Sequence, residues 1–353
     1  MRKIIANIHL KHIRENAEQF KTLSGKRLCA VVKANAYGHG AEEVTLALSG
    51  VADCFAVSLL SEALDLRVAA CGKDILILTP PMSEAETLCA AQNGFILTVP
   101  DLLCARLVVN VSEKYAVQVR VHLKTNTGMN RYGMNVAMLG RVCGYLSDRR
   151  RILVEGIYSH LYGDTRESAE TQRKLFVQMH AVCRRYFPKT IAHLSATFGS
   201  MLGDAFAFDM IRVGIGLYGY LPDGTKKLSD LPQLALQKGM TVYAQVTSER
   251  RYSFGGAGYG EPKLTIEKGE RLSVVRYGYA DGFLRNRKNG ANGYEHCVNH
   301  LCMDACVRAE KVKRGRLLPV LTDADETAEI ADTISYEVLC SATRRAEMVY
   351  DYD

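Results

Sequence analysis

Eight short apolar runs, alternating with amphipathic stretches, constrain the fold of the first two thirds of the chain. Each run has five to ten residues and is rich in Val, Ile or Leu, and most are bounded by Gly, Pro, Asn or Asp. Continuous apolar runs of this length are typical of strands buried on both faces of a parallel sheet. The runs cover residues 29–33, 54–58, 75–79, 95–99, 115–124, 154–160, 191–195 and 210–218.

Amphipathic stretches between these runs predict helices, among them residues 11–23, 41–48, 61–70, 83–91 and 165–186. Eight strand–helix repeats over about 220 residues match the size of a TIM-type (β/α)8 barrel. A doubly wound open sheet is the alternative, but no predicted strand is followed by a glycine fingerprint for a dinucleotide. The sequence therefore predicts an α/β protein that begins with a barrel.

The sequence pattern changes after Gly219. Residues 221–224, Leu-Pro-Asp-Gly, predict a turn, and from Met240 onward polar and apolar residues alternate. Seven glycines then punctuate the chain between residues 255 and 282. This pattern is typical of a smaller, mostly β domain. We expect the barrel to cover residues 1–235 and the C-terminal domain to cover residues 236–353.

The composition excludes several classes of function. The net charge is +7, but the basic residues are scattered and no aromatic residues are interleaved with them, which argues against nucleic-acid binding. Charged residues interrupt every apolar run before it reaches the length of a membrane span. The N-terminus lacks a signal-peptide pattern, and the 11 cysteines lie in apolar segments, as reduced thiols do. We expect a soluble cytoplasmic protein.

Lys33 ends the first predicted barrel strand, and barrel enzymes place their active sites at that end of their strands. Partial burial would lower the pKa of the lysine amine and make it a usable nucleophile. A lysine that escapes to solvent at a strand end explains this position equally well on its own. The following residues, 34–40, are mostly small or polar, so the loop could approach a ligand closely.

The last predicted barrel strand ends with Arg212 and alternating glycines. Gly214 and Gly216 would expose backbone N–H groups, which suit a phosphate at the end of the last strands of a barrel. A tight turn is the commoner explanation of such glycines. An arginine inside so apolar a run must have a buried partner or an anionic ligand.

These motifs together resemble the alanine racemase family, whose members combine a barrel with a C-terminal β domain. Residues 32–40, Val-Lys-Ala-Asn-Ala-Tyr-Gly-His-Gly, look like the cofactor-lysine signature of that family. The resemblance covers nearly the whole chain and implies pyridoxal 5'-phosphate as cofactor and L- and D-alanine as substrates. D-alanine supply for a bacterial cell wall is the family's usual role. Further matching stretches follow in order at 124–133, 155–160, 211–219, 278–282 and 302–304.

The resemblance also implies which residues move protons. Lys33 would hold the cofactor aldehyde as a Schiff base and, once freed by the substrate amine, act as one base. Tyr259 would be the second base, contributed to the opposite face of the cofactor by the partner subunit of a homodimer. Racemisation needs two such bases because a planar carbanion must be able to gain its proton from either side.

Other residues would bind the cofactor and the substrate, again by resemblance. Arg131 would contact the phenolic oxygen of the cofactor and the substrate carboxylate, and the Met303 backbone would meet that carboxylate. Arg212 would face the pyridine nitrogen, from which an arginine cannot accept a proton. His160 would lie beside the ring and orient Arg212, although a hydrogen-bonded core histidine is an open alternative. The phosphate would be held by Tyr37, Thr197, Gly214, Ile215 and Arg344.

Some positions depart from the family pattern near the phosphate and substrate pocket. Ala196 stands where an asparagine is usual, although Thr197 keeps a hydroxyl. Arg344 stands where a tyrosine is expected, and it could grip a phosphate bidentately. His300 aligns with a usual arginine, and Asn126 with a common aspartate. A serine or broad small-amino-acid racemase is therefore an alternative, as is a catalytically degenerate protein that only binds the cofactor.

Two further architectures compete for the same cofactor. A single-barrel protein of pyridoxal-phosphate homeostasis would lack the roughly 115 residues beyond the barrel. Decarboxylases or D-threonine aldolases with a barrel and a β domain are a second possibility, and such decarboxylases use an acidic partner where this chain has Arg212. Retention of Lys33, Arg131, Arg212 and Tyr259 also argues against the degenerate protein.

A metal site is the remaining alternative for one stretch of the C-terminal domain. His296, His300, Cys302 and Cys306 would share one face of an extended strand. Their spacing fits no CxxC pair, so we predict no metal.

Overall fold

The computed structural model describes residues 3–222, 225, 228, 230–257, 259, 266–284, 297 and 301–352. The chain divides into two compact units. The barrel unit comprises Arg14–Ala34 and Ala41–Leu236, and the sheet unit comprises Met1–Ile13, Asn35–Gly40 and Gln237–Asp353. No helix among the described residues has both the length and the apolar character needed to span a bilayer.

Eight parallel strands form the centre of the barrel unit, in the order β8-β7-β6-β5-β4-β3-β2-β9. The Asp209 N–H donates to Ala192 O at 3.0 Å and the Arg212 N–H donates to Ser195 O at 2.9 Å, so β9 also meets β8 and the sheet closes. The predicted (β/α)8 architecture is confirmed. The strands are β2 (Arg27–Val31), β3 (Cys54–Val57), β4 (Ile75–Ile77), β5 (Ile96–Val99), β6 (Val119–Lys124), β7 (Ile152–Tyr158), β8 (Ile191–His193) and β9 (Met210–Val213).

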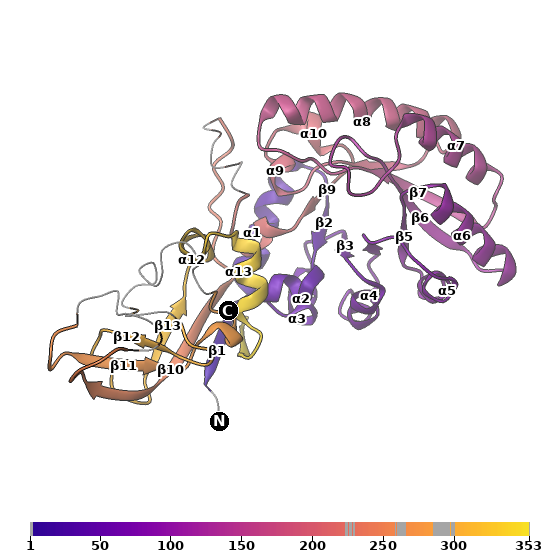
Figure 1. The fold of residues 1–353 in the computed structure, drawn as a ribbon. Coiled ribbons are helices and arrows are strands. Elements are labelled where there is room, and N and C mark those ends of the chain that lie inside the picture. The colour runs from indigo at the N-terminus through magenta and orange to yellow at the C-terminus, as the bar shows by residue number, and fades with distance from the viewer. Residues whose placement is uncertain are drawn as a thin grey trace. The chain divides into compact units, whose positions relative to one another are not determined.

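Helices surround this barrel on its outside (Figure 1). Side-chain caps fix where several of them begin: Asp101 accepts from the Cys104 N–H and Thr165 accepts from the Ser168 N–H. The helices and short turns between Leu10 and Tyr218, of which α2 belongs mostly to the sheet unit, are α1 (Leu10–Ser24), α2 (Lys33–Gly38), α3 (Ala41–Leu48), α4 (Leu60–Leu66), α5 (Glu84–Gln92), α6 (Leu102–Lys114), α7 (Val136–Ser147), α8 (Arg166–Tyr186), α9 (Thr197–Ser200), α10 (Asp204–Ala207) and η1 (Ile215–Tyr218).

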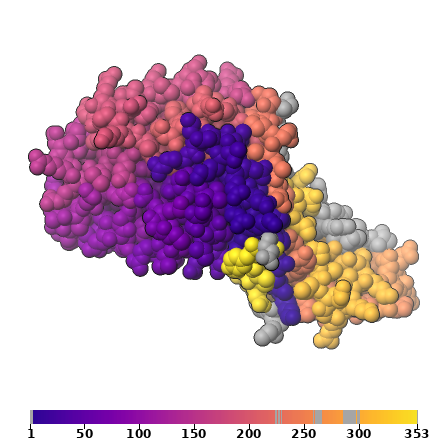
Figure 2. Space-filling view, turned by 180° about the vertical axis from the view of Figure 1, so that it is seen from behind, coloured from indigo at the N-terminus to yellow at the C-terminus, as the bar shows by residue number. Residues whose placement is uncertain are grey.

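The sheet unit is built on strands in the order β12-β11-β10-β1-β14, with β13 paired to β10. The first strand, β1, pairs antiparallel with β10 and parallel with β14, and Figure 2 shows the indigo N-terminal residues beside the yellow C-terminal strand. The elements are β1 (Ile4–His9), β10 (Met240–Arg251), β11 (Arg271–Val275), η2 (Tyr279–Asp281), β12 (Cys306–Arg308), β13 (Leu317–Leu321), α12 (Ala324–Ala331), α13 (Ser335–Ala342) and β14 (Glu347–Asp351).

The pairing of β1 corrects one expectation. The sequence pattern predicts residues 1–235 as barrel, whereas the structure groups Met1–Ile13 and Asn35–Gly40 with the C-terminal sheet. The burial of β1 alternates strictly between buried and half-buried positions, as expected for a strand in a sheet with one face against a core. Barrel strands such as β3 and β5 are instead buried at every position.

Candidate functional site

The half-buried Lys33 lies just beyond the carboxyl end of β2 and begins the short helical turn α2. The next four residues all have left-handed backbone angles, with φ between 51° and 55°. Left-handed helix costs an L-residue about 1–2 kcal/mol, and such strain persists mainly at functional sites. Gly38 completes the turn at φ 83°, where an added Cβ would lie 2.3 Å from Leu339 O. The strained residues are Ala34, Asn35, Ala36 and Tyr37.

Arg212 projects from β9 and is only 3% exposed. Its Nη1 lies 2.9 Å from His193 Nδ1 and 3.0 Å from His193 O. Its Nη2 donates to Ser159 O at 2.6 Å and to Leu194 O at 3.2 Å, and lies 3.4 Å from His160 Nδ1. Neutral acceptors therefore hold this buried cation. They are the buried partners that an arginine in so apolar a strand was expected to have.

A chain of two histidines extends inward from Arg212. His193 Nε2 lies 2.9 Å from His122 Nδ1, and both rings are buried. An arginine can only donate, so His193 must accept at Nδ1 and carry its hydrogen on Nε2. His122 must then accept at Nδ1 and carry its own hydrogen on Nε2. Burial lowers the pKa of His122 to about 3 and that of His193 well below its ordinary value, with Arg212 adding repulsion, so both rings are neutral at pH 7.

Tyr158, the last residue of β7, packs against several members of this cluster. Its ring stacks on that of His193 with centroids 4.8 Å apart, and its hydroxyl lies 2.7 Å from Thr98 Oγ1. The guanidinium of Arg212 and the amine of Lys124 lie 5.1 Å and 5.2 Å from the ring centroid. Cation–π attraction therefore replaces part of the hydration that both cations lose on burial.

Lys124, the last residue of β6, is buried and donates from Nζ to Thr125 O at 2.7 Å. Burial, followed by repulsion from Arg212 and Arg131, lowers the pKa of its amine to about 7. Lys124, His193 and His122 are functional candidates that the sequence motifs did not predict. The available signal was the repeated placement of polar residues at the ends of apolar strands.

A second group at the same barrel end involves Thr197 and the residues after β9. Thr197 is buried, and its Oγ1 accepts from the Gly216 N–H at 3.2 Å, which leaves the hydroxyl hydrogen to donate. An added Cβ at Gly216 would lie 2.5 Å from Phe20, so this position must be glycine. The predicted phosphate ligands Gly214 and Ile215 directly precede Gly216 along the chain.

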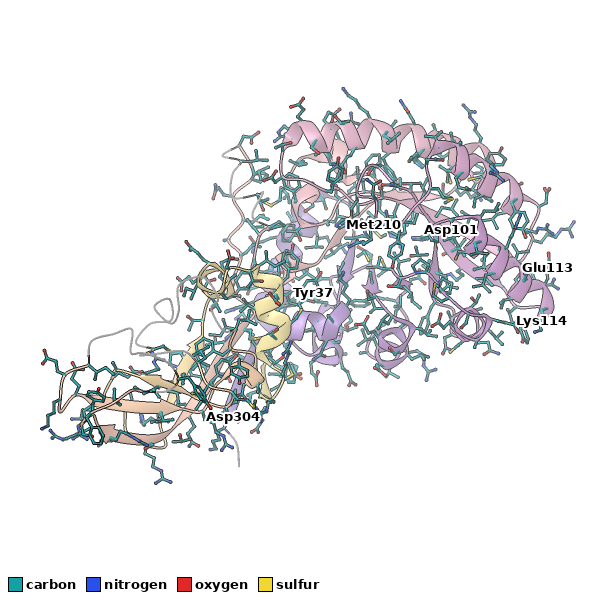
Figure 3. The ribbon with its side chains drawn as sticks, in the orientation of Figure 1. Tyr37, Asp101, Glu113, Lys114, Met210 and Asp304 are labelled. Atoms are coloured by element: carbon teal, nitrogen blue, oxygen red, sulfur yellow. The ribbon has the colours of Figure 1, made fainter. Side chains whose placement is uncertain are left out.

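Four predicted site residues belong to the sheet unit. The ring of Tyr37 lies 6.0 Å from that of Tyr336 on α13, and burial raises the pKa of its hydroxyl; Figure 3 labels Tyr37. Arg344 follows α13, and its Nη2 lies 3.4 Å from Ser341 Oγ. Tyr259 is 68% exposed, and Met303 is also exposed. Their roles stay predictions.

The structure brings the barrel-unit candidates to one end of the barrel, because Lys33, His160, Thr197, Arg212, Gly214 and Ile215 all follow or end barrel strands. Burial and repulsion from Arg212 hold the pKa of His160 well below its ordinary value. Arg131 is exposed in the loop after β6. No group of three or more metal-ligating side chains occurs in the described part of the chain, and His296 and His300 lie outside it.

The donor set fits pyridoxal phosphate. A lysine at a strand end can bond its aldehyde, a threonine hydroxyl with neighbouring backbone N–H groups suits its phosphate, and a permanently charged arginine can donate to its ring nitrogen. Lys33, Thr197 and Arg212 would supply these three functions. The fold and this donor set define a barrel enzyme of amine chemistry.

Comparisons with known proteins support this class of protein and identify its family. The family models for the alanine racemase N-terminal and C-terminal domains match residues 8–222 and 239–350. The chain belongs to the alanine racemase family. It is 32% identical to the alanine racemase of Lactobacillus delbrueckii subsp. bulgaricus, over 98% of this chain and 96% of that protein.

Solved structures of known proteins support the same family. The alanine racemase of Clostridium difficile 630 superposes with a TM-score of 0.88 at 27% identity, covering 99% of this chain and 96% of that one. The alanine racemase from Bartonella henselae, whose structure has covalently bound pyridoxal phosphate, superposes with a TM-score of 0.87 at 25% identity, covering 99% and 100%.

Proposed function

We propose that this protein is a pyridoxal-phosphate-dependent isomerase that interconverts L- and D-alanine. The observation that carries the proposal is the environment of Arg212, at the same barrel end as Lys33. Every hydrogen-bond partner of its guanidinium in the described structure is a carbonyl oxygen or a histidine nitrogen. The group that would face the pyridine nitrogen is therefore a fixed donor.

This donor decides the kind of reaction that the site favours. Bound pyridoxal phosphate supplies an electron sink that makes the α-proton of an amino acid acidic. Arg212 cannot accept a proton and repels one nearby, so it weakens that sink. A weaker sink favours prompt return of the proton to the α-carbon over transamination or elimination, which is the outcome that racemisation requires.

Lys33 and Tyr259 are the two bases in this proposal. The Lys33 amine would remove or return the α-proton on one face, and the Tyr259 hydroxyl would do so on the other. Lys33 is half-buried just beyond the carboxyl end of β2, the end of the barrel at which Arg212 also lies. Tyr259 is exposed in this single chain, which suits a residue that completes a neighbouring site.

A homodimer follows from that assignment, and the exposed apolar side chains at the site end of the barrel support it. Exposed apolar side chains that gather on one side of a domain are typical of interaction surfaces. Each of these residues lies between a barrel strand and the first turn of the next helix: Leu59, Met82, Leu103, Val136 and Tyr162. A partner subunit would cover them while it delivers its Tyr259.

The choice between alanine and serine as substrate depends on two residues that depart from the family pattern. Ala196 precedes α9 without a side-chain cap, and Arg344 places a cation where a tyrosine is expected. The arginine would alter the charge and shape beside the substrate side chain, so serine is the second candidate substrate. We place the enzyme in the cytoplasm because all 11 cysteines are free, and we expect it to supply D-alanine for a cell wall.

Proton exchange tests the proposal. Purified protein with added pyridoxal phosphate is incubated with L-alanine or L-serine in heavy water, and α-proton loss is followed by NMR before chiral analysis of the product. We expect exchange with formation of D-alanine. Y259F should lose one direction of proton transfer while it still binds the cofactor. No exchange with either substrate, despite a bound cofactor, would refute the proposed activity.

A further inference from the structure

The barrel has a second opening, at the amino ends of its strands. A cavity of about 210 Å³ lies there. This volume is smaller than the roughly 300–1,000 Å³ of pockets for drug-sized ligands, so an occupant has only a few non-hydrogen atoms. Five of its lining residues are the first residues of their strands: Arg27 (β2), Cys54 (β3), Ile96 (β5), Ile191 (β8) and Met210 (β9), the last of which Figure 3 labels.

Charges of both signs line this cavity. Arg120 Nη1 donates to Asp74 Oδ1 at 2.6 Å, while its Nη2 and Nε donate to the two oxygens of Glu155, both at 2.9 Å. Arg120 thus occupies both oxygens of Glu155 but only one of Asp74, and Asp74 Oδ2 makes no hydrogen bond in the described structure. Arg27, at the rim, has no hydrogen bond or ion pair from its side chain among the described residues.

His122 supplies a neutral donor to the same cavity. Its Nδ1 accepts from His193, so its hydrogen lies on Nε2, at the opposite edge of the ring. This ring needs the space that Gly156 provides, because an added Cβ there would lie 2.7 Å from His122 Nε2. The remaining lining residues are apolar: Cys54, Leu76, Ile96, Ile191 and Met210.

We propose that this cavity binds a small zwitterionic amino acid, separately from the site at the carboxyl end of the barrel. The ligand carboxylate would meet Arg27 and the His122 Nε2–H, and its ammonium would meet Asp74 Oδ2. A short side chain would contact the apolar strand residues, such as Leu76 and Ile96. The fit comes from two groups in one small cavity, the Arg27 guanidinium and the Asp74 Oδ2 atom, neither of which has a hydrogen-bond partner among the described residues.

Ligands of a single charge fit the cavity less well. The two carboxylates, with Arg120 and Arg27, bring the local charge close to zero, so neither a simple anion nor a simple cation gains much net attraction. A dipolar ligand gains from both ends. Because Asp74 and Glu155 are partly exposed, solvent screens these contacts and we expect binding in the millimolar range.

N,N-dimethylglycine is the probe for this site. It keeps the carboxylate and one N–H of a small amino acid, but it has no primary amine and so cannot bond covalently to the cofactor. Saturation-transfer NMR on its methyl signals, with the holoenzyme, gives the dissociation constant. R151Q is the matched control, because Arg151 is exposed and directly precedes β7 at the same barrel end but does not line the cavity.

We expect wild type and R151Q to bind the probe equally and R27Q to bind it at least tenfold more weakly, with R27K in between. Acetate and trimethylamine, which each carry half of the zwitterion, should compete poorly. Equal binding by R27Q, or no binding by wild type, would overturn the proposal. Competition by acetate as strong as that of the probe would also overturn it, by identifying a simple anion site. None of these results depends on racemase activity.

Discussion

Replacing Lys124 with methionine tests how the barrel tolerates cations without carboxylate partners. Lys124 is buried beside Tyr158, and Arg212 and Arg131 repel its charge. K124M keeps the length and apolar stem of the side chain but removes the amine. The variant therefore isolates the cost of keeping a protonated amine in this position.

The size and sign of the effect follow from the pKa of about 7 in the folded protein, against about 10.4 in an unfolded chain. Below pH 7 both states carry the proton, and the wild type bears the full cost of burying the charge. Between pH 7 and 10.4 only the unfolded state carries it, so the free energy of unfolding rises with pH, by up to about 1.4 kcal/mol per unit. Between pH 6 and pH 9, the advantage of K124M over wild type should shrink by roughly 2–3 kcal/mol.

Urea unfolding followed by circular dichroism at both pH values measures this change. The pKa itself is read by NMR from lysine labelled with ¹⁵N at Nζ, with K124M assigning the signal. A stability difference that does not vary with pH, together with an Nζ pKa above about 9, would show that this amine is not desolvated as the structure indicates.

Four further outcomes follow from single contacts. G156A should destabilise the barrel by about 1–3 kcal/mol because its Cβ would collide with His122, whereas G140A, whose Cβ would meet only Val182 at 4.0 Å, should be neutral or stabilising in urea unfolding. T197V should weaken cofactor binding in a fluorescence titration while T197S restores it; equal affinity in all three proteins would remove Thr197 from the phosphate site. K33A should lose the visible absorbance of the protein-bound cofactor, and its persistence would mean that another amine holds it. R344Y should raise the ratio of alanine to serine turnover, and an unchanged ratio would exclude Arg344 from the substrate pocket.

The barrel was predictable because several of its strands, such as β3, β4 and β5, are buried at every position and leave a continuous apolar run in the sequence. The position of β1 in the C-terminal sheet was not predictable from the sequence. Its partners, β10 and β14, lie more than 230 residues away in the chain, and pairing over such distances leaves no local signal. The left-handed turn after Lys33 was also hidden, because Ala34, Ala36 and Tyr37 do not favour positive φ. Tertiary contacts, such as the close approach of Gly38 to Leu339, impose it.

The candidate site was predictable where a motif carried it and hidden where geometry did. Lys33 and Arg212 stood out as charges at the ends of apolar strands. His193 and His122 are polar and buried inside the same barrel, but their role depends on a hydrogen bond between strands that are not neighbours in the sheet. A pattern along one strand cannot reveal a contact across the interior of a barrel.

The charge of Arg212 links these observations. Its hydrogen-bond partners are all neutral, so its positive charge is not cancelled nearby and reaches the surrounding groups. After burial, that charge is the largest cause of the lowered pKa of Lys124, His160 and His193. The same field would oppose a proton on a pyridine nitrogen placed against the guanidinium. A carboxylate in place of His193 would offset this field and weaken that opposition, so the neutrality of the histidines supports the role proposed for Arg212.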